Sequence, residues 1–268
     1  MAVDIDQQTQ PWRARPVKRV YIPKSNGKQC PLGIPVMRDR VIQARVKNVL
    51  EPEWEVRFES RSYGFRPGRG SHDAIQAIFS TAKGKTAKRQ WVLDADLAAA
   101  FDRIDHDHLL GGVGGFPARE LVRQWLKAGV VDNGYFTRTD EGTPQGGVIS
   151  PLLLNIAIHG IEEAVGVRFA TRKGKVMWAA KGTPILVRYA DDFAVFCTSK
   201  EGPSTAAKRT AQRKPNDARR HHSTVVASEL ALLHLVPRWA RPERIRPEPV
   251  RDDHTVTGVI TEWVKGAA

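Results

Sequence analysis

The sequence predicts a mixed α/β fold of the α+β type, in which antiparallel strand pairs alternate with amphipathic helices. In residues 17–35, β-branched and aromatic residues flank a Ser-Asn-Gly turn, where Gly27 supplies the positive φ of a hairpin. In residues 185–197, two apolar strand segments flank an acidic bend, which indicates a second hairpin. Between them, apolar residues recur at helical spacing from Asp39 until Pro52.

The other expected elements are indicated by Gly, Pro and helix-capping residues and by the spacing of apolar residues. A Gly/Pro-rich basic loop precedes Ser71, which is a typical helix N-cap, and Pro117 suits the first turn of a helix. In chain order we expect a flexible lead-in at 1–16, helices at 39–56 and 71–82, a buried strand at 91–97, a helix at 117–130, a Gly-rich loop at 141–151 and a helix at 152–165.

The charge of the chain favours a polyanionic partner. Forty-two Lys and Arg against 29 Asp and Glu give a net charge of +13 over 268 residues, and nucleic acid is the commonest such partner. A charge that only maintains solubility, or that binds anionic lipid, is the alternative. No Lys-rich amphipathic helix of the membrane-surface type is visible.

Composition also indicates the cellular compartment and limits the kinds of cysteine site that the chain can form. No stretch approaches the ~18 consecutive apolar residues that cross a bilayer, and the first residues lack the apolar core of a secretory signal. We therefore expect a cytoplasmic protein with no membrane partner. Cys30 and Cys197 stand far apart, so neither a disulfide framework nor a zinc knuckle is indicated.

Acidic residues in apolar surroundings are the most informative feature. Asp94 and Asp96 lie in WVLDADL, and Asp191 and Asp192 lie in VRYADDFAVF. Ionised carboxylates in such surroundings are costly unless they are paired or bind metal. Each segment alone is better explained as a turn or strand end, whose Asp caps backbone N–H groups or pairs with Arg188. Both segments together, with a Gly-rich loop between them, favour one site where two adjacent strands hold divalent cations.

Hard oxygen ligands that leave room for water and phosphate suit Mg²⁺. We expect two Mg²⁺ ions, for which Mn²⁺ is a substitute, at a separation of about 3.5–4 Å. Such a pair activates a primer 3′-hydroxyl and stabilises the departing pyrophosphate.

Five blocks of the chain resemble, in order, the successive blocks of group II intron reverse transcriptases. They are RVYIPKSNGKQCPLGIPVMRDRVIQ at 19–43, RSYGFRPGRGSHDAI at 61–75, DLAAAFDRIDHDHLL at 96–110, GTPQGGVISPLLLNI at 142–156 and YADD at 189–192. The resemblance covers roughly residues 17–200. It implies a right-hand polymerase, with fingers at 17–90 and, at 91–200, a palm whose antiparallel sheet carries the catalytic Asp residues.

The resemblance also implies roles for the acidic residues. Asp96 matches the first metal-binding aspartate, Asp191 the second, and Asp192 its acidic partner, so all three are expected catalytic and metal-binding residues. Asp94, two residues before Asp96, would be a supporting or structural group.

Nucleotide-binding residues are implied in the same way. Phe101 matches the aromatic that packs under the sugar of the incoming dNTP and excludes a 2′-hydroxyl, and Gln145 and Gly146 match the loop against the nascent base pair. From the residues alone, a core Phe at a strand end is the simpler interpretation of Phe101. The family usually has Arg where this chain has Cys30, and Lys24 and Lys28 are expected to substitute for it in part.

Four residues are expected to contact nucleic acid. Tyr189 matches the aromatic near the primer terminus, although a Tyr in a strand is most often plain core. Arg61, Arg66 and Arg69 belong to the basic loop of the second block. Within DLAAAFD, Ala98, Ala99 and Ala100 replace the Lys-Gly-Phe-like run of the family.

After residue 200 the composition changes. Residues 201–268 are rich in Pro, Arg and His, and we expect a divergent basic tail that is disordered or arises from a shifted reading frame. The helical thumb (maturase domain) of the family is not recognisable there, and a truncated chain is expected.

The resulting prediction is a two-metal RNA-directed DNA polymerase, a nucleotidyltransferase of the group II intron type from a mobile element. Its expected partners are an RNA template or intron RNA, a DNA primer and dNTPs. We expect the shortened chain to be weakly active or inactive. The alternatives are a non-catalytic RNA-binding splicing cofactor of the maturase type and a decayed remnant. The oligomeric state does not follow from the sequence.

Overall fold

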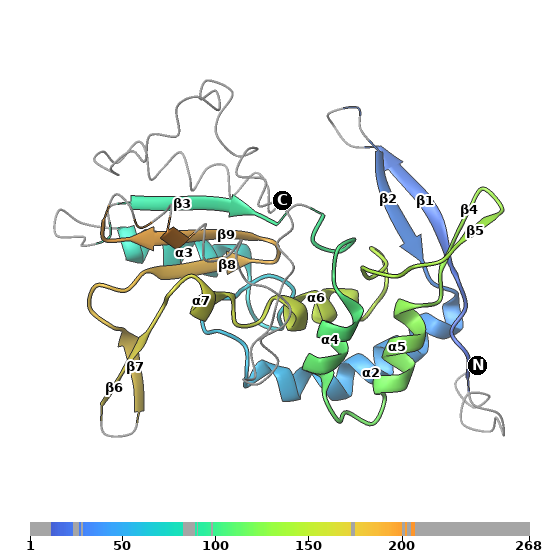
Figure 1. The fold of residues 1–268 in the computed structure, drawn as a ribbon, viewed down its shortest axis with the longest axis horizontal. Helices are drawn as coiled ribbons and strands as arrows, with labels where there is room; N and C mark the ends of the chain where they lie inside the picture. Colours follow the sequence, from blue (N-terminus) through green and yellow to red (C-terminus); the bar gives the residue numbers. More distant parts are fainter. Residues whose placement is uncertain are drawn as a thin grey trace.

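The computed structural model describes residues 12–23, 27, 29–82, 89, 91–97, 99–172, 175–199, 202 and 205–206. The two larger sheets lie at opposite ends of a helical layer (Figure 1). Within the described residues, no helix has the length and apolarity needed to span a membrane.

The first sheet has the strand order β2-β1-β4-β5. The expected hairpin is confirmed: β1 (Val17–Pro23) pairs antiparallel with β2 (Gln29–Ile34), and Gly27 between them has a φ of 77°. A second hairpin, β4 (Val130–Asp132) and β5 (Tyr135–Thr137), joins the edge of β1. The sequence analysis missed this hairpin, although its turn is Asn133-Gly134, a strong signal for a two-residue hairpin loop.

The second sheet has the order β3-β9-β8 and is antiparallel throughout. It consists of β3 (Trp91–Asp96), β8 (Ile185–Tyr189) and β9 (Asp192–Cys197), so the predicted strand and the predicted second hairpin are both confirmed. We call it the palm sheet. A separate pair, β6 (Phe169–Arg172) and β7 (Lys175–Ala179), precedes β8.

Six described helices accompany the sheets: α2 (Met37–Glu55), α3 (Ser71–Ala82), α4 (His106–Val113), α5 (Arg119–Leu126), α6 (Ser150–Ile158) and α7 (Ile161–Ala164). The helices expected at 39–56 and 71–82 are confirmed. The helix expected at 117–130 is shorter, and the one expected at 152–165 is two helices, because Gly160 adopts a φ of 86° between them.

The palm sheet is buried on both faces at β9, and alternate residues of that strand enter two different cores. Phe193 and Val195 belong to the larger core, which continues into α2, α4, α5 and α6. Ala194 and Phe196 belong to the smaller core, which continues into α3. This burial explains why β9 is an unbroken apolar run after its first residue.

Residue 90, the expected boundary between fingers and palm, does not separate these layers. The β4–β5 hairpin joins the sheet of β1 and β2, although it lies in the segment expected to form the palm. Conversely, α3 from the finger segment packs on β8. The two expected units are therefore interleaved along the chain.

The lead-in expected to be flexible at 1–16 is ordered where the structure describes it. The indole of Trp12 lies 4.3 Å from the Arg38 guanidinium and donates a hydrogen bond of 2.7 Å to Asp39. Residues 1–11 and most of the expected tail at 201–268 lie outside the described residues.

The carboxylate of Asp39 holds together three parts of the chain. It is 1% exposed and accepts hydrogen bonds from the Trp12 indole, the Trp125 indole (2.9 Å) and the Arg15 amide (3.1 Å). We predict that Asp39→Ala lowers the free energy of unfolding by about 3 kcal/mol or more, because at least one buried donor loses its partner. Denaturant unfolding measures this loss.

Two further variants serve as comparisons for Asp39→Ala. Asp39→Asn retains an acceptor oxygen and should cost clearly less than Asp39→Ala. Asp140→Ala, at an exposed position, should stay within about 0.5 kcal/mol of the parent. Equal stability of Asp39→Ala and Asp140→Ala would contradict the anchoring role of Asp39.

Candidate active site

Three carboxylates meet where β3 ends and β9 begins. Asp96 is the last residue of β3 and pairs across the ladder with Asp192, the first residue of β9. Asp191 precedes it in the turn, and its carbonyl accepts a hydrogen bond of 3.2 Å from the Leu97 amide. The structure thus brings together the three residues that the sequence analysis selected.

The turn that carries Asp191 is tight and close to another loop. Ala190 has a φ of 57°, a left-handed conformation that an L-residue with a side chain adopts at a cost. Gly64 packs directly against it, since a Cβ added to Gly64 would lie only 2.2 Å from the Ala190 nitrogen. Only glycine fits at this position. The basic loop of residues 61–70 therefore rests on the turn.

The electrostatics of the three carboxyl groups share one cause. Burial, and then the neighbouring Asp191, raise the pKa of Asp96, and burial also raises the pKa of Asp191. Burial, followed by repulsion from Asp191, Asp96 and Asp94, raises the pKa of Asp192 to about 7. Like charges are thus crowded together in a half-buried place, and a bound cation would relieve the repulsion.

The donor set fits a hard divalent cation, because it supplies carboxylate oxygens and leaves space for ligands from outside the protein. Among the described residues, however, no group of three or more His, Cys, Asp and Glu side chains is arranged to hold an ion unaided. Asp96 and Asp191 would hold the ions together with substrate oxygens, and Asp192 would contribute charge.

The Gly-rich loop is held by the first sheet and by α2. The Gly33 amide of β2 donates a hydrogen bond of 2.7 Å to the Gln145 carbonyl, and the Val148 amide donates one of 2.9 Å to the Gln43 side chain of α2. Gly146 is exposed, with a φ of 118° that favours glycine. The backbone around Gln145 and Gly146 is therefore held in place between β2 and α2.

Cys30 lies against this loop. Its thiol donates a weak hydrogen bond of 3.7 Å to the Gln145 side chain. The position where the family usually carries Arg thus faces a residue expected to touch the nucleotide. Lys24 and Lys28 lie outside the described residues.

Phe101 is half-buried and lies five residues after Asp96. Its ring packs partly on the larger core and meets the exposed ring of Phe65 edge to face, with centroids 6.1 Å apart. Phe65 has a φ of 58°, so it too is held in a strained conformation. Tyr189 is partly buried and packs on the smaller core.

The three arginines of the basic loop differ in their surroundings. Arg66 is 6% exposed and commits its guanidinium to the Glu55 carboxylate, at 2.7 Å, and to the carbonyls of Glu59 and Ser62. Its donors are therefore not available to a phosphate, and Arg66 does not fit the role in nucleic-acid binding that the sequence predicted. Arg61 bonds to Thr81 (3.2 Å) and Arg69 to the carbonyl of Ser60 (2.7 Å), but both remain partly exposed.

Sequence reasoning missed the buried polar residues behind the turn. The sequence indicated Arg188 only as a partner for an aspartate, and it indicated no role for Asn155 or Glu59. A polar residue inside an apolar run, such as Asn155 in LLLNIAI, is the signal that selects such positions.

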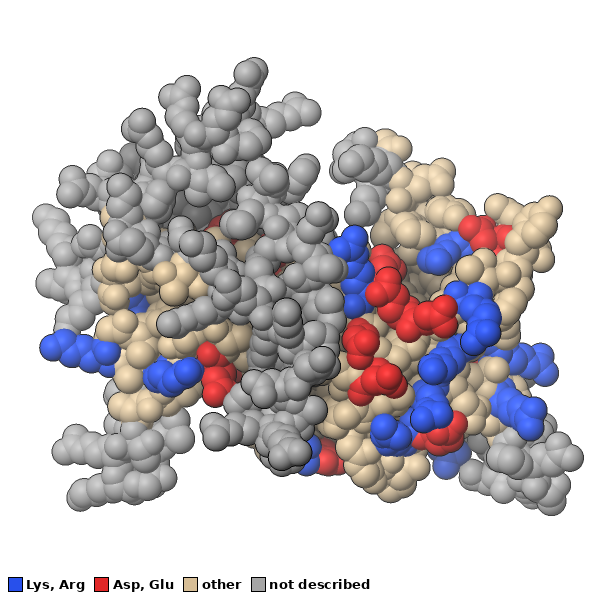
Figure 2. All heavy atoms as spheres, in the orientation of Figure 1, with Lys and Arg blue, Asp and Glu red and all other residues tan. Residues whose placement is uncertain are grey.

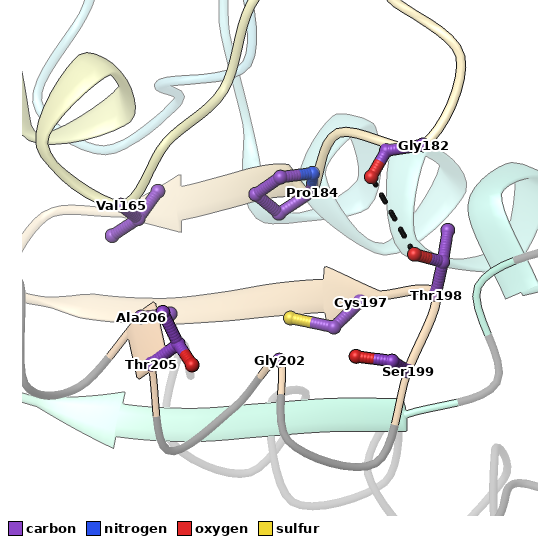
Figure 3. Close-up of a pocket in the computed structure, with 9 residues that line it drawn as sticks. All are labelled: Val165, Gly182, Pro184, Cys197, Thr198, Ser199, Gly202, Thr205 and Ala206. Carbon is purple, nitrogen blue, oxygen red and sulfur yellow. Dashed lines mark hydrogen bonds between the residues drawn. The ribbon is translucent and has the colours of Figure 1, made fainter.

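A small hollow lies at the other end of the palm sheet. It has a volume of about 180 Å³ and is lined by residues that include Pro184, Cys197 and Gly202 (Figure 3). Cys197 ends β9, whereas the carboxylates lie where β9 begins. Thus this hollow is not part of the candidate active site.

A family model described as reverse transcriptase (RNA-dependent DNA polymerase) matches residues 22–223. The chain belongs to the reverse transcriptase family. Protein YkfC of Escherichia coli K12 is 40% identical over 205 residues, which cover 67% of this chain and 54% of YkfC. The group II intron-encoded protein LtrA of Lactococcus lactis subsp. cremoris is 40% identical over 156 residues, or 56% of this chain and 25% of LtrA.

These relatives confirm the resemblance to group II intron reverse transcriptases. This reverse transcriptase chain spans about half of YkfC and a quarter of LtrA. Solved structures support the predicted right-hand fold: two telomerase structures from Candida tropicalis superpose with TM-scores of 0.54 and 0.55 at 15% identity. They cover 78% and 77% of this chain, and the matches take in 48% and 39% of the telomerase chains.

The raised pKa of Asp192 predicts a pH-dependent stability. The folded-state pKa of about 7 lies above the ordinary value of 3.8, so folding favours the protonated carboxyl. This contribution is fully present below pH ~4 and is lost as the pH rises through 7. In EDTA, Asp192→Asn should therefore raise the melting temperature more at pH 8 than at pH 4, by roughly 2–4 °C for each kcal/mol of repulsion removed.

Thermal melts of both proteins at several pH values measure this difference. The matched control is Asp140→Asn, which changes the net charge equally at an exposed position. A difference that does not vary between pH 4 and pH 8 would contradict the crowding of carboxylates at this site.

Proposed function

We propose that this protein is an RNA-directed DNA polymerase of the group II intron type. The observation that carries the proposal is the pairing of Asp96 with Asp192 across β3 and β9, with Asp191 on the adjoining turn. These residues stand in a chain that belongs to the reverse transcriptase family.

Divalent ions, when bound, supply the charge that activates the primer 3′-hydroxyl and stabilises the departing pyrophosphate. The protein contributes the position and the charge of the ligands. Asp96 and Asp191 present their oxygens from the ends of paired elements, so their spacing is fixed by backbone hydrogen bonds. Asp192 adds negative charge beside them, and thereby favours cation binding above its pKa of about 7.

The nucleotide side of the site is formed by Phe101 and the Gly-rich loop. In this proposal the sugar of a dNTP packs on Phe101, and the loop with Gln145 and Gly146 lies against the nascent base pair. The anchoring of that loop to β2 and α2 supports the assignment, because it limits the movement of the backbone. Cys30, where the family usually has Arg, predicts a weaker hold on the triphosphate.

The template and primer strands require positive charge. The chain carries a net charge of +13, and Figure 2 shows Lys and Arg side chains, interspersed with Asp and Glu, over the side of the molecule where α2 and α5 lie. Arg61, Arg69 and Tyr189 lie in elements that adjoin the turn of Asp191. An RNA template or intron RNA, and a DNA primer, are the proposed partners.

The rival hypothesis, a splicing cofactor that only binds RNA, does not account for the three carboxylates. Their crowding disfavours the ionised state, and their charge repels phosphate groups. A surface that served RNA binding alone would gain from losing them. The site geometry therefore favours catalysis over simple binding.

Replacement of a proposed ligand tests the function. We predict that Asp191→Asn reduces primer extension on an RNA template with Mg²⁺ by at least about 100-fold, because a metal ligand and its charge are removed. RNA affinity should stay unchanged or rise, since one negative charge is lost. Extension and binding are measured on the same preparation, with Asp140→Asn as the charge-matched control.

An Asp191→Asn variant that extends primers at the parental rate would remove Asp191 from the site. A parent that binds RNA but shows no extension with either Mg²⁺ or Mn²⁺, even when the thumb of a related enzyme is fused after Lys200, would overturn the polymerase proposal and leave the splicing cofactor.

A second prediction concerns the choice of sugar. Phe101→Val should increase the incorporation of NTP relative to dNTP by about 10-fold or more, because a smaller side chain leaves room for the 2′-hydroxyl. Single-nucleotide extension with dNTP and NTP measures the ratio. Phe65→Val, which trims the ring that meets Phe101, is the matched control and should leave the ratio near that of the parent.

A further inference from the structure

A fully buried arginine lies behind the turn that carries Asp191. Arg188 of β8 is 0% exposed. A guanidinium is rarely buried so completely, because its charge is then removed from water. Its Nε and Nη2 atoms have no hydrogen-bond partner among the described residues, so the guanidinium uses only part of its hydrogen-bonding capacity. Something other than solvation must explain its place.

The bonds that Arg188 does make are directed at the turn. Its Nη1 atom donates to the carbonyl oxygen of Ala190, at 3.0 Å, and to the side-chain oxygen of Asn155, at 2.9 Å. Ala190 is the residue in the left-handed conformation that precedes Asp191. The guanidinium thus holds the peptide group that joins Ala190 to Asp191, and the orientation of this group helps to set the direction of the Asp191 side chain.

Asn155 extends the same hold to the neighbouring loop. Its amide nitrogen donates a hydrogen bond of 2.9 Å to the carbonyl of Gly64, and Asn155 is itself fully buried in α6. Since Gly64 packs against Ala190, Asn155 also supports the turn through Gly64. The backbone of Arg188 completes the arrangement, because its amide bonds to Arg61 and its carbonyl accepts from Tyr63, both at 2.9 Å.

Glu59 balances the buried charge. Its carboxylate lies 3.8 Å from Arg188 Nη2 and 3.1 Å from His159 Nδ1. Burial opposes ionisation of Glu59, but the adjacent His159 ring and the charge of Arg188 outweigh it and hold its pKa at about 2. Glu59 is therefore an anion that compensates Arg188 without contacting the turn.

Stability alone does not account for this arrangement. A buried ion pair often adds little or nothing to stability compared with apolar residues of similar volume. An arginine whose hydrogen bonds go to a strained turn, and whose charge is balanced mainly by Glu59 with smaller contributions from Glu162 and Asp191, is better explained by the geometry that it imposes.

We propose that Arg188, with Asn155 behind it, is a positioning residue that fixes the Ala190 peptide and thereby aims Asp191 at the catalytic cation. The inference rests on the proposed function, since it assigns Arg188 a task in the same site. Arg188 contacts neither the cation nor the substrate. It acts through the backbone of the turn.

The test separates positioning from charge balance. Arg188→Met alone leaves Glu59 buried without its cation and should destabilise the protein. The double variant Arg188→Met with Glu59→Gln removes both charges and should recover most of the melting temperature. It still lacks the hydrogen bond to Ala190, so its affinity for Mn²⁺, titrated by electron paramagnetic resonance without nucleotide, should be weaker by about 10-fold or more.

A matched control comes from another ion pair of the same region, in which the arginine is buried and the carboxylate is partly exposed. Arg66 and Glu55 form an ion pair of 2.7 Å, and among the contacts described Arg66 makes none with Ala190. Arg66→Met with Glu55→Gln should keep the parental Mn²⁺ affinity, whatever its melting temperature. In primer extension the Arg188 double variant should lose kcat, while its KM for dNTP stays near that of the parent.

Each outcome decides between the two claims. Parental Mn²⁺ affinity in the Arg188 double variant, beside a parent that loses Mn²⁺ binding on Asp191→Asn, would overturn the positioning role and leave the proposed function intact. A parent whose Mn²⁺ binding does not depend on Asp191 would overturn both. Equal losses of affinity in the Arg188 and Arg66 double variants would also overturn the inference, because any buried pair would then have the same effect.

Discussion

The pairing of β3 with β9 is the interaction on which the candidate active site depends. Asp96 and Asp192 belong to strands separated by most of the palm segment, and only the ladder places them opposite one another. Side chains alternate between the faces of a strand, so a slip of one residue would turn Phe193 and Val195 from the larger core to the smaller one. Because both faces of β9 are buried, such a slip is costly. The packing of β9 therefore fixes the register, and the register fixes the carboxylates.

The ionised carboxylates in turn destabilise the fold that positions them. Burial and mutual repulsion disfavour ionised Asp96, Asp191 and Asp192, so the metal-free site is a local source of instability. The Leu97 amide at Asp96 and the charge of Arg188 near Asp191 offset part of this cost, while Gly64 packs under the turn and Leu97 bonds to the Asp191 carbonyl. A site of this kind gains most from a cation, and its ligands need little rearrangement to receive one.

Much of this arrangement could be predicted from the sequence, and the reasons are local. The β1–β2 hairpin is encoded by its turn, the palm strands by their apolar runs, and the three Asp residues by their improbable surroundings. The β4–β5 hairpin carries an Asn-Gly turn and was missed because its strands have only three residues each. The break at Gly160 was missed because the apolar pattern continues through it. Arg66 was misjudged for a different reason: its partner Glu55 lies eleven residues away on another element, and only the fold brings the two together.

Backbone strain separates the site from the rest of the molecule. Four described residues other than glycine have a positive φ: Phe65, Ala99, Asn133 and Ala190. Asn133 is explained by its hairpin turn, where a left-handed Asn is ordinary. The other three have no such reason. Ala190 precedes Asp191, Ala99 follows Asp96 by three residues, and Phe65 follows the glycine that supports Ala190 and meets Phe101.

Such conformations cost of order 1–3 kcal/mol each and persist only where the surroundings over-determine them. At Ala190 these surroundings are visible, because Arg188 holds its carbonyl and Gly64 leaves space for its backbone. A glycine at position 190 would adopt the same conformation without strain, but it would also let the turn sample others. An alanine held by a buried arginine has fewer alternatives. The direction of Asp191 is thus set by packing and hydrogen bonds behind the turn, at residues that no substrate touches.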